Sequence, residues 1–164
     1  MKINYSQAIK IFMIFCVLFS FFLGGQGIEN AQIVQAQAGI NLALNQPTYA
    51  SSSRSGHIAS HAVDGSLSTY WSSAYSEPQW IYVDLGASYA ISQVILKWEN
   101  AYGRNYRVDG SADATTWTQL VEVTNQNGGS DYIEVVGTWR YIRIYCVLRG
   151  TGWGFGLLEF EVYD

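Results

Sequence analysis

The feature that most limits the fold of this chain is a succession of short segments rich in β-branched and aromatic residues, separated by clusters of Gly, Asn, Asp and Ser. Such segments are typical of β-strands joined by turns, and helical periodicity is almost absent. Eight strands are predicted, over residues 48–53, 79–84, 91–98, 105–110, 116–123, 131–136, 140–148 and 157–163. One helical turn is expected at 57–63. The pattern predicts a single all-β domain, either a sandwich or a barrel.

Apolar and polar side chains alternate along the last two predicted strands. Because successive strand residues point to opposite faces of a sheet, one row of each strand is expected in the core. These rows are Ile142, Ile144, Cys146 and Leu148, and Leu158, Phe160 and Val162. The opposite row of the final strand carries Glu159 and Glu161, which must face solvent, a partner or a cation. Cys146 is the only cysteine after the N-terminal segment, and we expect a buried free thiol there.

The N-terminal segment has the features of a secretory signal peptide. Two lysines precede an apolar run at 11–23, which is shorter than the roughly 20 residues of a transmembrane helix. Ala36 and Ala38 match the small residues before a cleavage site, which assigns residues 1–38 to the signal peptide. Cleavage after Gly27 is an alternative, and an uncleaved membrane anchor is the other interpretation. The signal predicts a secreted, extracellular protein, which is either free or associated with the cell surface.

The mature domain, residues 39–164, is acidic. It holds seven Lys/Arg and twelve Asp/Glu residues, a net charge of −5, so it lacks the basic surface that binds nucleic acid or anionic membranes. We therefore expect no nucleic-acid partner and no membrane insertion after signal cleavage. A hydrolase would need an activated nucleophile or a carboxylate pair that flanks its substrate, and the sequence shows neither. We interpret His57 and His61, the only histidines, as ordinary surface residues.

A tight loop over residues 62–71 carries oxygen ligands. Asp64 and Thr69 lie on either side of the bend at Gly65, and such a loop can turn several carbonyl oxygens inward. Calcium takes about six to eight oxygen ligands, carboxylates and carbonyls among them. A site here would need a second carboxylate, for which Glu159 is the best candidate. The alternative is a turn stabilised only by the side chains of Asp64 and Thr69.

Aromatic residues gather in the predicted loops. Trp153 and Phe155 alternate with glycines, which cannot cover the two rings, so the rings are either exposed or folded over the end of the sandwich. Tyr70 and Tyr75 occupy a second loop. Each ring on its own is explained by packing, but two glycine-flanked rings together make a binding surface an equal alternative.

A third loop, after the strand that ends at residue 98, supplies polar groups. Glu99, Asn100 and Tyr102 offer a carboxylate, an amide and a phenol. Flat rings beside a few hydrogen-bonding groups suit a polar ring-shaped ligand such as a sugar, because the rings cover its apolar face. The three loops therefore indicate a sugar site in which Glu99 or Asn100 fixes the hydroxyl groups.

Five motifs occur in the order in which they stand in a known domain family. They are NLALNQP at 41–47, AVDG at 62–65 with TYWSS at 69–73, QWIYVDLG at 79–86, RYIRIY at 140–145 and LEFEVY at 158–163. Together they resemble the coagulation-factor type C, or discoidin, domain, and its bacterial branch, carbohydrate-binding module family 32. The resemblance covers residues 40–164 and implies an eight-stranded antiparallel jelly-roll β-sandwich of the galactose-binding type. Residues 98–103 and 152–163 are similar to modules attached to secreted chitosanases and glucanases.

The resemblance implies a structural calcium ion in the loop around Asp64. Its ligands would be the carboxylates of Asp64 and Glu159, both oxygens of Thr69, and the carbonyl oxygens of Ala62, Ser66 and Leu158. The ion would brace the loops without touching the sugar.

The resemblance also implies a sugar site on the loops at one end of the sandwich. Glu99 would accept hydrogen bonds from amines or hydroxyls of the ligand, with Tyr102 in the same motif. Ring surfaces would come from Tyr75, Trp153 and Phe155. Tyr70 stands where relatives often carry an arginine.

We therefore interpret the sequence as a secreted, non-catalytic carbohydrate-binding module for a polysaccharide or oligosaccharide of the chitosan or β-glucan class. A cell-surface adhesion or protein-interaction domain is the alternative, and it would use the same loops on a protein partner. A module without an attached enzyme would act as a lectin, an adhesin or an accessory to a separate secreted hydrolase.

Overall fold

The computed structural model describes residues 39–164, so the predicted signal peptide and its cleavage site lie outside the described residues. The elements are β1 (Thr48–Ala50), a short 3-10 helix η2 (Ala59–Ala62), β2 (Trp71–Ser72), β3 (Gln79–Trp98), β4 (Gly103–Ser111), β5 (Thr118–Val123), β6 (Ser130–Arg149) and β7 (Gly156–Tyr163). Every strand pairing is antiparallel, which confirms the all-β prediction. Within residues 39–164, no helix is long and apolar enough to cross a membrane.

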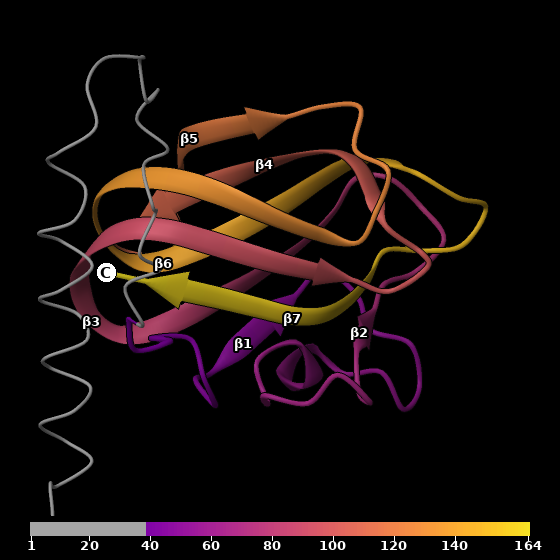
Figure 1. Cartoon of the computed structure of the whole chain (residues 1–164), viewed down its shortest axis with the longest axis horizontal. Coiled ribbons are helices and arrows are strands. Elements are labelled where there is room, and N and C mark those ends of the chain that lie inside the picture. The colour runs from indigo at the N-terminus through magenta and orange to yellow at the C-terminus, as the bar shows by residue number, and fades with distance from the viewer. Residues whose placement is uncertain (1–38) are drawn as a thin grey trace, which may run out of the picture. The chain divides into compact units, whose positions relative to one another are not determined.

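The two longest strands, β3 and β6, pair with each other and belong to two layers at once (Figure 1). The first half of β3 pairs with β1, and its second half pairs with β7. The second half of β6 pairs with β4, which in turn pairs with β5. One layer therefore has the order β1-β3-β6-β4-β5 and the other β6-β3-β7-β2. Both strands turn where their pairing is interrupted, between Asp84 and Tyr89 on β3, and Gly86 takes a positive φ of 81° there.

Each of the eight predicted strands overlaps an observed strand, but residues 51–53 and 116–117 lie outside β1 and β5, and four of the predicted strands are parts of only two observed ones. Segments 79–84 and 91–98 are the two halves of β3, while 131–136 and 140–148 are the two halves of β6. The glycines at these bends are residues typical of turns, so the sequence indicated strand ends there. In the structure each strand continues through its bend from one layer into the other. The two-residue strand β2 was not predicted, and residues 39–164 contain seven strands.

The core fills the space between the layers and contains the predicted apolar rows except Leu148 and Leu158. Leu158 is only partly buried, because a register shift in the pairing of β3 with β7, between the pairs Lys97–Glu159 and Trp98–Leu157, interrupts the alternation there. Ile142, Ile144 and Cys146 are fully buried, and burial raises the pKa of the Cys146 thiol above its usual range. The prediction is wrong for Leu148, which is 39% exposed. The reason is a register shift in the pairing of β4 with β6, between the pairs Asn105–Leu148 and Tyr106–Cys146, which ends the alternation.

The outer face of the five-stranded layer carries aromatic rings packed against arginines. Tyr49 on β1 stacks on Tyr82 of β3, with ring centroids 5.0 Å apart. Arg143 on β6 lies 4.2 Å from the centroid of Trp117 and forms an ion pair with Asp109 at 2.7 Å. These contacts join neighbouring segments of the layer, so we assign this face a structural role.

Candidate functional site

Three loops meet where β2, β3 and β7 lie side by side, at the right of Figure 1. Trp71 and Trp98 are both paired with Leu157 of β7. Backbone hydrogen bonds then tie the loops together: the Glu99 N–H donates to the Gly156 carbonyl at 2.9 Å, and the Ser73 N–H donates to the Phe155 carbonyl at 2.9 Å. The three loops that the sequence singled out thus form one surface.

Two aromatic rings stand on this surface. Trp153 is 61% exposed and meets Tyr75 edge to face, with ring centroids 5.7 Å apart and planes at 76°. The guanidinium of Arg54 lies 4.9 Å from the centroid of the Tyr75 ring. A ligand placed here would therefore meet the open face of an indole beside a tyrosine and a cation.

The prediction that Phe155 offers a ring surface is wrong, because its side chain is fully buried. The backbone decides this: the Phe155 N–H donates to the Ser73 hydroxyl at 2.9 Å, and the Phe155 carbonyl accepts from Ser73. Gly154 makes this approach possible, since a Cβ at that position would lie 2.5 Å from the Ser73 carbonyl oxygen. The loop is thus held on β2, and the Phe155 ring turns into the core.

Glu99 is half-buried and held in place at the end of β3. Its Oε2 accepts a hydrogen bond from the Ala101 N–H at 2.9 Å, and its Oε1 accepts one from the Asn100 side chain at 3.0 Å. Each carboxylate oxygen keeps capacity for another donor, because carboxylate oxygens accept more than one hydrogen bond. Glu99 can therefore receive an amine or hydroxyl of a ligand in a fixed orientation.

Tyr102 and Tyr70 have other neighbours. The Tyr102 ring packs beneath the Trp153 loop, so closely that a Cβ on Gly150 would lie 2.1 Å from it. Tyr70 stacks on His57, with ring centroids 4.1 Å apart. Within residues 39–164, no aromatic contact joins either tyrosine to Trp153. Tyr102 supports the loop from below, and Tyr70 lies beside the surface rather than in its centre.

The sequence interpretation missed the ion pair that anchors the Trp153 loop. The Glu77 carboxylate accepts from the Arg149 backbone N–H at 2.6 Å and from its guanidinium at 3.1 Å. The same guanidinium donates to the Trp153 carbonyl at 3.2 Å. Arg149 directly precedes the glycine-rich loop, but its partner is 72 residues away, so only the folded structure reveals the pair.

Acid is expected to loosen this anchor. The pKa of Glu77 is lowered from 4.5, first by the backbone hydrogen bond from Arg149 and then by the guanidinium charge. A lowered pKa in the folded state means that the contribution to stability is complete above pH 4.5 and is lost as the pH falls through the folded pKa. We expect the Trp153 indole resonance to shift below pH 4.5 in the wild type. In Glu77→Gln the resonance should already be displaced at neutral pH, and an unchanged resonance would contradict the anchor.

The second predicted site surrounds Asp64. The carboxylate of Asp64 accepts from the Ser66 N–H at 2.9 Å and from the Thr69 hydroxyl at 2.8 Å. That hydroxyl also lies 3.2 Å from the Ser66 carbonyl oxygen. Ala62 ends the helix η2 just before this loop. The loop thus closes on itself as a turn, and its oxygen atoms crowd together.

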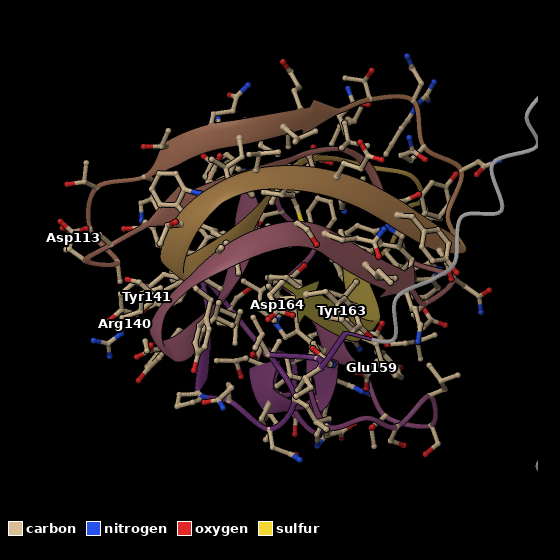
Figure 2. All side chains as sticks on the ribbon, turned by 60° about the vertical axis from the view of Figure 1, so that its left-hand side comes forward. Asp113, Arg140, Tyr141, Glu159, Tyr163 and Asp164 are labelled. Carbon is tan, nitrogen blue, oxygen red and sulfur yellow. The ribbon has the colours of Figure 1, made fainter. Side chains whose placement is uncertain are left out.

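Glu159 on β7, labelled in Figure 2, lies close enough to the same loop for the charge of Asp64 to act on its carboxyl group. Its side chain is 2% exposed, and neither carboxylate oxygen has a hydrogen-bond partner within the described chain. Burial and the nearby charge of Asp64 raise its pKa to about 7, although the backbone N–H groups of Gly65 and Ser66, which lie close but outside hydrogen-bond geometry, act in the opposite direction. An unpartnered buried carboxylate beside a second carboxylate is costly unless a cation compensates for it. Among residues 39–164, no three His, Cys, Asp or Glu side chains cluster, so a cation here would need hydroxyl and carbonyl oxygens as well.

The two layers and their loop-borne surface define an antiparallel β-sandwich of the galactose-binding type. A model of the F5/8 type C domain matches residues 47–160, and the chain belongs to this family. A comparison with curated proteins gave no match.

Solved structures give the same assignment. Chitosan-binding module 2 of the chitosanase/glucanase from Paenibacillus sp. IK-5, in complex with chitotriose, is 42% identical with a TM-score of 0.74, over 76% of this chain and all of that one. Module 1 of the same enzyme is 45% identical with a TM-score of 0.73, over 76% and 98% of the two chains. The family 32 module of NanJ from C. perfringens, in complex with galactose, shares the fold at 20% identity, with a TM-score of 0.68 over 77% and 98% of the chains.

Proposed function

We propose that residues 39–164 form a non-catalytic carbohydrate-binding module whose loop surface holds a polysaccharide or oligosaccharide of the chitosan or β-glucan class. The observation that carries this proposal is the exposed Trp153–Tyr75 pair beside the fixed carboxylate of Glu99. The chitotriose complex of a module 42% identical to this chain supports the same ligand class.

The charge of the domain favours an amino sugar over a neutral glucan. A glucosamine ammonium paired with Glu99 forms a charge-assisted hydrogen bond, which is stronger than one between neutral groups. The net charge of −5 on residues 39–164 also attracts a polycation. A neutral β-glucan would depend on the rings and on hydroxyl contacts alone.

A bound calcium ion is part of the proposal. The unpartnered Glu159 carboxylate and the Asp64–Thr69 loop provide the oxygen chemistry that calcium prefers. The carboxylates of Asp64 and Glu159 would hold the ion, with oxygens of Thr69 and the carbonyls of Ala62, Ser66 and Leu158. The ion would supply positive charge that binds the loop to β7, at a distance from the sugar surface.

We infer that the module acts outside the cell, together with a hydrolase of the polysaccharide that it binds. The similar Paenibacillus modules derive from a chitosanase/glucanase, an enzyme that acts on polysaccharide. The residues of the loop surface provide rings, the Arg54 guanidinium and one fixed carboxylate, a set that suits binding rather than bond cleavage.

Glu99→Gln is expected to weaken the binding of chitotriose without unfolding the domain. Gln keeps an oxygen that can accept from the Ala101 N–H, so the loop is retained, but the charge is lost. A hydrogen bond to a charged group contributes about 1.5–3 kcal/mol, which corresponds to a loss of roughly 10- to 100-fold in affinity. Titration calorimetry at low and raised salt measures this, and wild-type binding should weaken with salt more than the binding of the variant.

The matched control is Glu122→Gln, which removes the same charge from an exposed position on β5. Equal losses in the two variants would indicate a general charge effect and would remove Glu99 from the site. Failure of the wild type to bind any chito-oligosaccharide or β-glucan would overturn the proposed function and favour a protein partner.

A further inference from the structure

A groove opens along one side of the sandwich, between β5 and the first half of β6. Each of these segments is the edge of its layer, so the two layers are not joined by hydrogen bonds along this side. The groove has a volume of about 440 Å³. It is lined by Val121, Val123, Gln126, Ser130, Asp131, Tyr132, Ile133 and Glu134.

Asp131 is fixed at the groove by the core. Its Oδ2 accepts a hydrogen bond from the Trp98 indole at 2.8 Å and one from the Tyr106 hydroxyl at 2.5 Å, and both donor residues are buried. Burial and this hydrogen bond raise the pKa of Tyr106, so the phenol remains a donor. One oxygen of Asp131 is thereby held in place, and the carboxylate is presented to the groove without a loss of side-chain freedom on binding.

The remaining lining supplies the groups that recognise a sugar. Tyr132, which is 69% exposed, and Glu134 alternate with the buried Ile133 along β6, so their side chains stand at the rim of the groove, where Tyr132 offers a ring. Gln126 offers an amide and Ser130 a hydroxyl, while Val121 and Val123 form an apolar wall. Glu134 adds a second carboxylate, and no lysine or arginine lines the groove. A ring beside polar groups fits a saccharide, and two carboxylates that form no ion pair within residues 39–164 fit one that carries ammonium groups.

The groove adjoins the loop surface. The backbone N–H of Trp98 donates to the Gly129 carbonyl at 2.8 Å, and the next residue, Ser130, lines the groove. Tyr102 packs against both Gly128 on this side and Gly150 at the start of the Trp153 loop. One segment of chain, 126–131, therefore connects the floor of the loop surface with the groove.

We propose that this groove is a second subsite for amino-sugar polymers, which a long chain occupies while its other units lie on the loop surface. The inference rests on the proposed function, since it extends the same ligand class to a new surface. A short oligosaccharide occupies the loop surface alone. Only long chains therefore gain affinity from contacts in the groove.

The test compares chitobiose with chitohexaose in titration calorimetry. Tyr132→Ala and Glu134→Gln should each weaken chitohexaose binding three- to tenfold and leave chitobiose binding within twofold. Both positions are exposed, and Asp131 is left intact because its loss would disturb the core. Matched controls are Tyr49→Ala on β1, where the tyrosine is 51% exposed, and Glu122→Gln on β5, outside the groove lining. Both should bind chitohexaose like the wild type.

The outcomes separate the two proposals. If Glu99→Gln weakens both sugars but the groove variants bind chitohexaose normally, the groove is not a subsite and the proposed function stands. Equal losses in the groove variants and their controls also overturn the subsite. If the wild type binds neither sugar, the proposed amino-sugar ligand and the groove both fail.

Discussion

Phe155→Ala is expected to destabilise the domain strongly, whereas Trp153→Ala should leave its stability almost unchanged. The Phe155 ring is fully buried, and truncation of a buried phenylalanine costs about 3–5 kcal/mol. Trp153 is 61% exposed, and a surface substitution usually changes stability by less than about 0.5 kcal/mol. The effects on ligand affinity should be reversed, with a loss on the order of tenfold for Trp153→Ala from its lost ring contact.

Thermal unfolding and calorimetric titration with chitotriose measure the two halves of this prediction. Phe155→Leu is the milder variant in case the alanine variant does not fold, and it should retain both the loop and the affinity. Tyr75→Ala serves as a second surface variant, because Tyr75 forms the edge-to-face contact with Trp153. A large fall in melting temperature for Trp153→Ala, with affinity retained, would assign that ring to the structure rather than to the binding surface.

The different positions of these two rings could not be predicted from the sequence. Residues two apart in an extended segment point to the same side, so local pattern assigns Trp153 and Phe155 the same role. Ser73, 82 residues earlier in the chain, separates them by holding the backbone at Phe155. Such a contact between distant segments leaves no local signal.

Strand positions were predicted well because alternation is a local property of the backbone. Ile142, Ile144 and Phe160 lie in the core as their spacing indicates. What the sequence did not reveal is continuity: Gly86 and Gly137, both at positive φ, mark bends within β3 and β6 rather than the ends of strands. A bend and a turn use the same residues, and only the partner strands distinguish them.

The candidate site shows the same division between local and distant signals. Asp64 and Thr69 interact within one loop, and their spacing already indicated a tight turn. Glu159 was the best candidate for a second carboxylate at this loop, but the alternation of the last strand placed it opposite the core row and did not show how deeply it is buried. The ion pair between Arg149 and Glu77 was not predicted, because neither residue belongs to a recognisable motif and their contact spans 72 residues.

Calcium is expected to raise the stability of the domain by about 4 kcal/mol when its free concentration is 1,000 times the dissociation constant. The physical reason is the buried Glu159 carboxylate, which is without a hydrogen-bond partner and close to Asp64. Thermal unfolding with calcium and with EDTA measures the difference, which should grow with calcium concentration. Asp64→Asn should abolish the response, and Glu122→Gln on β5 should retain it.

The sign of the pH dependence provides a further check on calcium. In EDTA the pKa of Glu159 is raised to about 7 in the folded state, against 4.5 when exposed. The raised pKa favours the protonated folded form, so stability should decline as the pH rises from 4.5 to 7, and excess calcium should remove this decline.

Glu159→Gln distinguishes a metal ligand from a buried acid. In EDTA at pH 8 the variant should be more stable than the wild type, because it buries no charge, and it should not respond to calcium. A wild type that is equally stable with calcium and with EDTA would contradict the ion. If Glu159→Gln were then still the more stable protein, the carboxylate would be an uncompensated cost, retained for a reason other than metal binding.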